Sequence, residues 1–195
     1  MVRKTARLRA SLLEVLARRR ARLAEALARR RVPLGFICGA LALLLAHPTR
    51  RTLIFGAVVA IAGEAIRIWA AGHLEKGREV TMSGPYRLTR HPLYLGSTLI
   101  GIGLVVASAN WWVTALVLAY LAVTLTAAIR TEEAHLTDKF GMAYPDYRGG
   151  RSAEGRRRFS IERALRNREY RAAIGVLLVL AFLAWKAGQA EGFAP

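Results

Sequence analysis

The segment Gly84-Pro-Tyr-Arg-Leu-Thr-Arg-His-Pro-Leu-Tyr-Leu-Gly96 separates two strongly apolar stretches of this 195-residue chain. It holds two prolines, two glycines, two arginines, a histidine and two tyrosines. Prolines fix backbone angles and remove hydrogen-bond donors, so Pro85 and Pro92 predict a shaped loop in front of a helix. Polar, conformationally fixed residues at the edge of an apolar stretch indicate a functional site rather than a simple connection.

The composition around this segment is both apolar and basic. The chain is 54% hydrophobic with a mean hydropathy of +0.26, yet its net charge is +17. Apolar blocks alternate with basic blocks along the chain, which is typical of a membrane protein with basic cytoplasmic segments. The single cysteine, Cys38, excludes an internal disulfide and a cysteine-based metal cluster. The histidines show no metal-binding pattern, so we expect no metal site.

Five apolar blocks predict the membrane helices. They are Val32–Ala46, Thr52–Ala71, Leu93–Ser108, Trp111–Ala128 and Ala172–Lys186. The second and fourth approach the ~20 residues that cross a bilayer, whereas the others must borrow flanking residues or lie in a thinned bilayer. Only Ala109 and Asn110 separate the third and fourth blocks, which predicts a tight hairpin. We therefore predict an all-α polytopic bundle of about five transmembrane helices.

The N-terminal region predicts a separate element. Residues 3–31 contain eleven Lys and Arg but only two acidic residues, and leucines at spacings of four or seven form one helical stripe. Such a basic amphipathic helix is typical of an anionic membrane surface. A nucleic-acid patch or a targeting presequence are the alternatives. The apolar block that follows favours the membrane, and no aromatic residue interleaves the basic ones, so we expect no nucleic-acid partner.

Charge bias predicts the orientation and the domain division. Segments 1–31, 72–91 and 131–171 hold 25 of the 30 Lys and Arg residues, so we place all three in the cytoplasm. No cleavable signal peptide is expected, because the first thirty residues are basic throughout. We expect an integral protein of a bacterial or archaeal-type plasma (inner) membrane. Residues 1–31 form the surface helix and residues 32–195 the membrane domain, with its core at 60–150; the oligomeric state is left open.

Two further motifs face the same side as the opening segment. Arg130-Thr-Glu-Glu133 ends the fourth apolar block, and Phe140-Gly-Met-Ala-Tyr144-Pro-Asp-Tyr147 follows it. Gly141 predicts the end of a polar helix that begins at Glu132. Within the second block, Glu64 and Arg67 are three residues apart, which predicts a structural ion pair or a pair of residues facing a cavity.

In order along the chain, these motifs resemble the isoprenylcysteine carboxyl methyltransferase and phospholipid methyltransferase superfamily of integral-membrane enzymes. The family pattern is Gly-Pro-Tyr-x-x-x-Arg-His-Pro-x-Tyr-x-Gly, a helical hairpin, Glu-Glu, and Phe-Gly-x-x-Tyr-x-x-Tyr. The resemblance covers about residues 60–150. It departs from the family after Tyr147, where Arg-Gly-Gly-Arg replaces a hydrophobic ending with proline, and in the fifth apolar block.

The resemblance implies methyl transfer from S-adenosylmethionine, with S-adenosylhomocysteine as product, at the cytoplasmic edge of the membrane. No glycine-rich Rossmann turn is present. Carried over by position, the cofactor-binding residues are Arg78, Glu79, Val80, Thr81, Tyr86, His91, Pro92, Leu93, Tyr94 and Glu132. Arg90 or Arg130 would face the acceptor, and Glu133 is a third candidate catalytic residue.

The chemistry of these side chains agrees with that implication. A helix start beside His91 suits the carboxylate of the cofactor, and Glu132 suits its amine or ribose. Methyl transfer to an anionic acceptor requires mainly positioning and water exclusion. An amine acceptor must lose a proton, for which Glu133 or Tyr94 could serve as relay.

The acceptor is left open. A lipophilic acceptor of the isoprenylcysteine carboxylate type comes first, and a phospholipid amine is the alternative. From another class of protein, a non-catalytic transporter or lipid-binding scaffold could also carry charges inside the membrane. A transporter is expected to show paired, broken spans in two halves, and no such repeat is visible.

Overall fold

The computed structural model describes residues 30, 32–151, 155 and 157–192. All regular elements in this part of the chain are helical. They are Val32–Leu45, α2 (Arg50–Ala71), the 3₁₀ turn η1 (Gly84–Arg87), α3 (Pro92–Ser108), α4 (Trp111–Phe140), α5 (Ala143–Arg148), α6 (Ile161–Arg166) and α7 (Tyr170–Gly192). The predicted all-α class is confirmed, and each predicted apolar block forms a helix. The predicted surface helix at 1–31 lies almost wholly outside the described residues.

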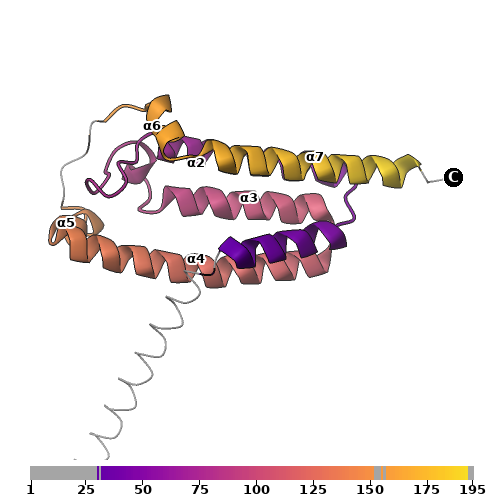
Figure 1. The fold of residues 1–195 in the computed structure, drawn as a ribbon, viewed down its shortest axis with the longest axis horizontal. Helices are drawn as coiled ribbons and strands as arrows, with labels where there is room; N and C mark the ends of the chain where they lie inside the picture. Colours follow the sequence, from indigo (N-terminus) through magenta and orange to yellow (C-terminus); the bar gives the residue numbers. More distant parts are fainter. Residues whose placement is uncertain (1–29, 31, 152–154, 156, 193–195) are drawn as a thin grey trace, which may run out of the picture.

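Three helices are long and apolar enough to cross a membrane: α2, α4 and the Tyr170–Ala190 part of α7. The helices Val32–Leu45 and α3 are apolar but shorter. In the bundle, α3 contacts α2, α4 and α7, while η1, α5 and α6 gather at one end (Figure 1). We call this the polar end, and the opposite end, where α3 turns into α4, the hairpin end.

Glycines bring α2 and α3 into close contact. A Cβ atom on Gly56 would lie 2.4 Å from the carbonyl oxygen of Gly103, and one on Gly63 would lie 2.7 Å from that of Gly96. Both pairs are spaced by seven residues, so they lie on one face of each helix. Small residues at such an interface let helix backbones approach in a membrane, where lipid provides no hydrophobic driving force. The α2–α3 pair is therefore the rigid centre of the fold.

The predicted hairpin is present between α3 and α4. Ala109 takes a left-handed conformation (φ 47°), and the Asn110 side chain caps α4 by accepting hydrogen bonds from the N–H groups of Trp112 and Val113. The Asn110 amide also donates to the Leu45 carbonyl at 2.7 Å. The Lys186 ammonium of α7 donates to the carbonyls of Leu43 and Leu44. These contacts satisfy the C-terminal end of the helix Val32–Leu45.

The polar helix predicted to begin at Glu132 is not a separate element. It is the last part of α4, which runs without interruption for 30 residues. No glycine or proline lies between Trp111 and Phe140, so nothing ends the helix at the membrane edge. Gly141, with φ 53°, ends it as predicted. A single helix thus fixes Glu132 and Glu133 relative to the apolar bundle.

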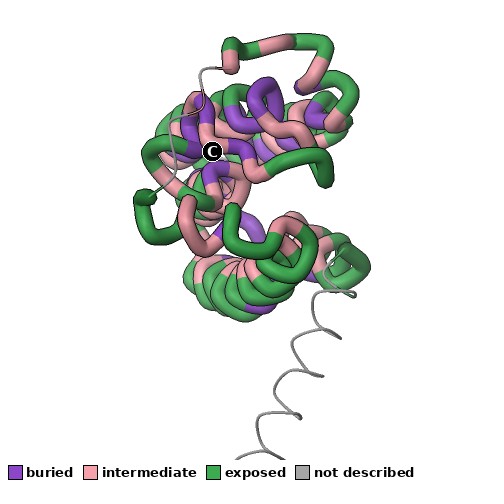
Figure 2. The backbone as a smooth tube through the Cα atoms, turned by 90° about the vertical axis from the view of Figure 1, so that its left-hand side faces the viewer, coloured by how far each residue is buried: buried purple, intermediate pink, exposed green. Residues whose placement is uncertain are grey.

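Most of the apolar helix surface is uncovered. In the most apolar 18-residue stretch of α4 and of α7, only 22% is buried inside the protein, and in that of α2 only 28% is. Figure 2 shows the same pattern, with short buried stretches along a tube that is mostly intermediate or exposed. Large side chains such as Phe55, Trp111 and Leu178 are exposed. An apolar surface of this extent requires lipid or another apolar partner around it.

The segment before α7 closes the polar end of α2. The Ser160 N–H donates to the Gly72 carbonyl, and the Asn167 amide donates to the carbonyls of Ala71 and Leu74. Arg163 donates to Glu75 at 2.9 Å, and this hydrogen bond is the main cause of the lowered pKa of Glu75. These contacts bring the start of α7 beside α2 and α3.

Candidate functional site

Glu133 joins the two halves of the family motif. Its Oε1 lies 3.1 Å from Nε2 of His91 and 3.4 Å from Nη1 of Arg90, and its Oε2 lies 3.8 Å from Nη1 of Arg148. His91 and Arg90 precede α3, Glu133 lies on α4 and Arg148 ends α5. Glu133 thereby contacts His91 and Arg90, which lie more than forty positions earlier in the chain. The carboxylate of Glu133 is the centre of the polar end.

The cations around Glu133 set its ionisation. Partial burial would raise the pKa of Glu133, but the His91 hydrogen bond, the nearby Tyr144 hydroxyl and the Arg90 charge outweigh it and lower that pKa. The Tyr144 hydroxyl is buried and makes no hydrogen bond with any described residue, although it lies close to this carboxylate. Burial and the Glu133 charge raise the pKa of Tyr144 to about 12. At neutral pH the site therefore pairs a carboxylate with a neutral phenol.

A second contact joins the same two halves. The Tyr147 hydroxyl of α5 donates to the Tyr86 carbonyl of η1 at 2.6 Å. Burial is the largest cause that raises the pKa values of both tyrosines. Gly84, which begins η1, has φ 58°, and a Cβ atom there would lie 2.6 Å from the His73 ring. The turn that presents Tyr86 to Tyr147 therefore requires glycine at this position.

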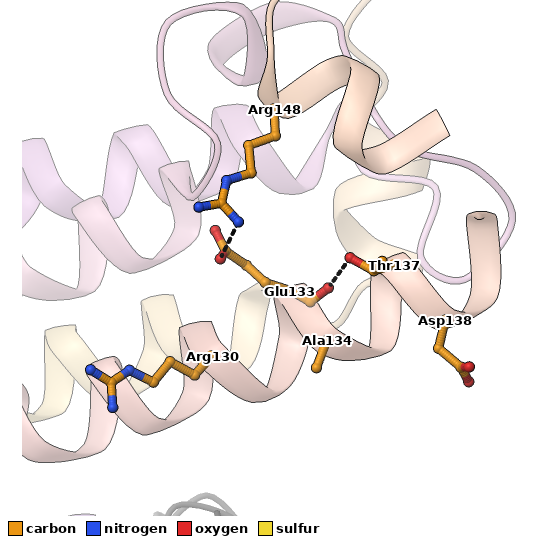
Figure 3. A pocket seen from close by; sticks show the side chains of 6 residues that line it. All are labelled: Arg130, Glu133, Ala134, Thr137, Asp138 and Arg148. Carbon is orange, nitrogen blue, oxygen red and sulfur yellow. Dashed lines mark hydrogen bonds and ion pairs between the residues drawn. The ribbon is translucent and has the colours of Figure 1, made fainter. Parts of the chain in front are cut away.

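An open hollow of about 500 Å³ adjoins Glu133 (Figure 3). Its lining residues are Arg130, Glu133, Ala134, Thr137, Asp138 and Arg148. Figure 3 shows the Arg148 side chain reaching from α5 to Glu133, whereas Arg130 extends along α4 away from that carboxylate. Arg130 makes no ion pair within the described part of the chain. The hollow thus combines the ion-paired Glu133 carboxylate with Asp138 and with Arg130, a cation that makes no ion pair with the described residues.

The start of α3 faces the same end of the molecule. Pro92 occupies the first turn, and no side chain caps it. Pro92 has no N–H group, and the N–H groups of Tyr94 and Leu95 donate to the His91 carbonyl. The Leu93 N–H makes no hydrogen bond with a described residue, and it lies at a helix end whose partial positive charge favours an anionic ligand group. The His91 and Tyr94 rings lie with centroids 5.8 Å apart beside this turn.

The structure brings some of the predicted site residues together and separates others. Arg90, His91 and Glu133 are in direct contact, and Arg130 lines the same hollow as Glu133. Glu132 is exposed and makes no hydrogen bond or ion pair with the other described residues; its charge acts on Tyr86 and Tyr144.

The segment from Arg78 to Thr81 makes its contacts elsewhere. Arg78 lies 3.8 Å from Glu75, Glu79 pairs with Arg157 at 2.8 Å, and the buried Thr81 hydroxyl accepts the Glu75 N–H. The partners of this segment are thus Glu75 and Arg157, which precedes α6. Its predicted role in cofactor binding remains a prediction.

The buried arginine of α2 has a partner that the sequence did not suggest. Arg67 Nε lies 3.8 Å from Glu64 but 2.6 Å from Glu169, which precedes α7. Both Glu64 oxygens are buried without a hydrogen bond to any described residue. A separation of 102 positions hides the Arg67–Glu169 pair from local patterns. Arg148 was likewise missed as a site residue, because its role depends on where α5 folds.

Comparison with known proteins identifies the class. Residues 34–143, more than half of the chain, match the phospholipid methyltransferase family, and the chain belongs to that family.

One relative is similar over a shorter stretch. It is the cobalt-zinc-cadmium resistance protein CzcN of Cupriavidus metallidurans, 37% identical over 76 residues, which are 38% of this chain and 35% of that protein. The chain thus matches about a third of the length of this relative. No solved structure matches significantly.

Proposed function

We propose that this protein transfers a methyl group from S-adenosylmethionine to a lipophilic acceptor at the cytoplasmic edge of a membrane. The observation that carries the proposal is the contact of Arg90 and His91 with Glu133, which assembles the family's two motifs beside an open hollow. Family membership supports the reaction class.

The residues at the polar end fit the cofactor. The Leu93 N–H at the uncapped start of α3, next to Pro92, suits a carboxylate, and the exposed Glu132 carboxylate suits an amine or ribose hydroxyl. The partly exposed Tyr94 ring lies in this turn beside His91, whereas Tyr86 is buried next to it in the chain segment before α3. S-adenosylmethionine supplies an electrophilic methyl group on a sulfonium, which an acceptor attacks in line.

Glu133 and its cations prepare the acceptor side. We assign Glu133 to hold Arg90, His91 and Arg148 in place, and Arg130 to face the acceptor. A carboxylate acceptor would need only positioning by Arg130 and exclusion of water. An amine acceptor, which the phospholipid name of the family favours, must release a proton, and Glu133 could receive it through its contact with His91.

The five apolar helices are assigned as five membrane spans with the polar end in the cytoplasm. The three long apolar helices support insertion in a membrane, and the basic segment 72–91 and the described parts of 131–171 lie at the polar end, which favours this orientation. The bilayer is then the immediate partner of the protein, and the acceptor arrives sideways from it.

Binding and product analysis test the proposal. Purified protein should bind S-adenosylmethionine and S-adenosylhomocysteine in isothermal titration. Labelled cofactor incubated with protein and a membrane lipid extract should yield a labelled lipid, whose identification distinguishes a methyl ester from a methylated amine. If neither cofactor form binds, the proposal that the protein is a methyltransferase is wrong, and a transporter or lipid-binding scaffold becomes the favoured function.

A further inference from the structure

A second hollow lies within the bundle, away from the Glu133 site. It encloses about 350 Å³ between α2, α3 and α7. Ile100 and Leu104 of α3 and Val176 and Val179 of α7 form its apolar walls, and Arg67 and Ser97 are its polar residues. We call this hollow the α7 groove. Both α2 and α7 are membrane-span candidates, so the groove opens toward lipid.

The polar end of the α7 groove is organised by Arg67. Its Nε donates to Glu169 at 2.6 Å, and its Nη1 donates to the Ser97 hydroxyl and to the Leu93 carbonyl. Its Nη2 makes no hydrogen bond to any described residue, while the side chain is 20% exposed. A guanidinium nitrogen with an unused donor at the end of an apolar groove can donate a hydrogen bond to an oxygen of a ligand.

The charge around Arg67 limits the ligand. Two carboxylates, Glu64 and Glu169, lie beside this one guanidinium, and the Glu64 oxygens are buried without a hydrogen-bonding partner among the described residues. The cluster therefore carries no spare positive charge for a second anion. A neutral oxygen can accept a hydrogen bond from Arg67 without adding charge, whereas a free carboxylate or phosphate meets the negative charges of Glu64 and Glu169.

Arg67 also connects this groove with the cofactor side. Leu93, whose carbonyl it contacts, belongs to the first turn of α3, two residues after His91. A chain lying in the α7 groove would have its polar end beside the turn assigned to the cofactor. The apolar part of the groove therefore lies toward lipid, and its polar end lies toward the proposed cofactor site.

We propose that the α7 groove holds the apolar chain of the methyl acceptor, and that Arg67 binds an uncharged oxygen at the polar end of a lipid whose head carries no net negative charge. This inference rests on the proposed methyl transfer. It assigns acceptor recognition in part to α7, the helix that lies beyond the family-matched residues 34–143.

Gly175 of α7 provides the test. It lines the groove, and a Cβ atom there would meet nothing within 4 Å, so we expect the larger side chain of Gly175→Leu to occupy the groove. Gly188 of the same helix is equally open but lies outside the groove, which makes Gly188→Leu the matched control. Thermal unfolding of both variants in detergent verifies that they fold.

Photolabelling tests whether a long-chain ligand binds in the α7 groove, and it does not depend on catalysis. The full chain in phosphatidylcholine nanodiscs is irradiated with a diazirine-bearing long-chain alcohol, and the label is mapped by mass spectrometry. We expect label on Ile100 or Val176, loss of it in Gly175→Leu, and retention in Gly188→Leu. Dodecanol should compete, and dodecanoate should compete at least about tenfold more weakly. Label elsewhere, or equal competition by dodecanoate, overturns the proposal.

Measurement of turnover then tests whether the groove binds the methyl acceptor. With the methyl acceptor from a lipid extract, Gly175→Leu should reduce labelled product at least about tenfold while the affinity for S-adenosylmethionine stays unchanged. Wild-type turnover in this variant overturns the acceptor assignment. Groove labelling in a protein that binds no S-adenosylmethionine would refute the methyl-transfer function and retain a lipid-binding groove, so the two failures are distinguishable.

Discussion

His91 Nε2 lies 3.1 Å from Glu133 Oε1, and this contact joins the end of the proline-bounded loop to the polar part of α4. Two neighbouring carboxylates therefore have different surroundings. Glu133 is held by His91, Arg90 and Arg148, whereas Glu132 is exposed and unpaired among the described residues. We therefore assign the stabilising role to Glu133 and the cofactor-binding role to Glu132.

Substitution of these two carboxylates should give opposite results. Glu133→Gln should lower the free energy of unfolding by about 1 kcal/mol, because it removes partly exposed ion pairs. Glu132→Gln should leave stability unchanged but weaken S-adenosylmethionine binding about tenfold or more. Thermal unfolding and isothermal titration on both variants provide the comparison. Equal effects of the two substitutions on both measurements would refute the division of roles.

Acid should remove the stabilisation by Glu133. Its pKa is lowered in the folded protein, so its contribution is fully present above the usual glutamate pKa of 4.5 and is lost as the pH falls below that value. The difference in melting temperature between wild type and Glu133→Gln should therefore shrink between pH 7 and pH 4. Glu75→Gln should behave in the same direction, since Arg163 lowers the pKa of Glu75. A difference that grows in acid would contradict this sign.

The α2–α3 contact should not tolerate a methyl group. Gly63→Ala places a Cβ atom 2.7 Å from the backbone oxygen of Gly96, so the helices must separate. We expect a loss of about 1–3 kcal/mol of unfolding free energy. Gly39→Ala, at a helical position where a Cβ atom meets nothing within 4 Å, is the control and should be neutral or slightly stabilising. Similar melting temperatures for both variants would show that the helices do not pack this closely.

The Tyr147 hydroxyl should matter to both stability and binding. Tyr147→Phe removes its hydrogen bond to the Tyr86 carbonyl, which should cost about 0.5–1.5 kcal/mol. Because Tyr86 belongs to the assigned cofactor side, S-adenosylmethionine affinity should fall as well. Tyr170→Phe, at an exposed position on α7, is the control. Unchanged affinity of Tyr147→Phe for S-adenosylmethionine would show that α5 does not contribute to the cofactor site.

Cysteine labelling should establish the orientation. In a Cys38→Ser background, Trp111→Cys lies at the hairpin end and Lys139→Cys at the polar end, both at exposed positions. A membrane-impermeant maleimide applied to intact cells should label only the former, and permeabilisation should expose the latter. The reverse pattern would place the site on the outer face.

The order of the helices could be predicted from the sequence because apolar blocks, prolines and turn residues act locally. The boundaries at Leu93, Ser108 and Trp111 lie within one residue of the observed ends of α3 and α4. The continuity of α4 through Glu132 was missed, since a change from apolar to polar side chains does not end a helix that contains no glycine or proline.

The sequence by itself determined the helical class, the hairpin, the family motifs and the candidate residues near Gly84–Gly96, because each depends on spacing along the chain. The tertiary structure alone decided that Glu133 rather than Glu132 contacts His91, that Arg67 pairs with Glu169, and that α7 forms a wall of the groove. These contacts join residues 42 and 102 positions apart. Such pairs form only after α2, α3 and α7 pack together, so no local pattern contains them.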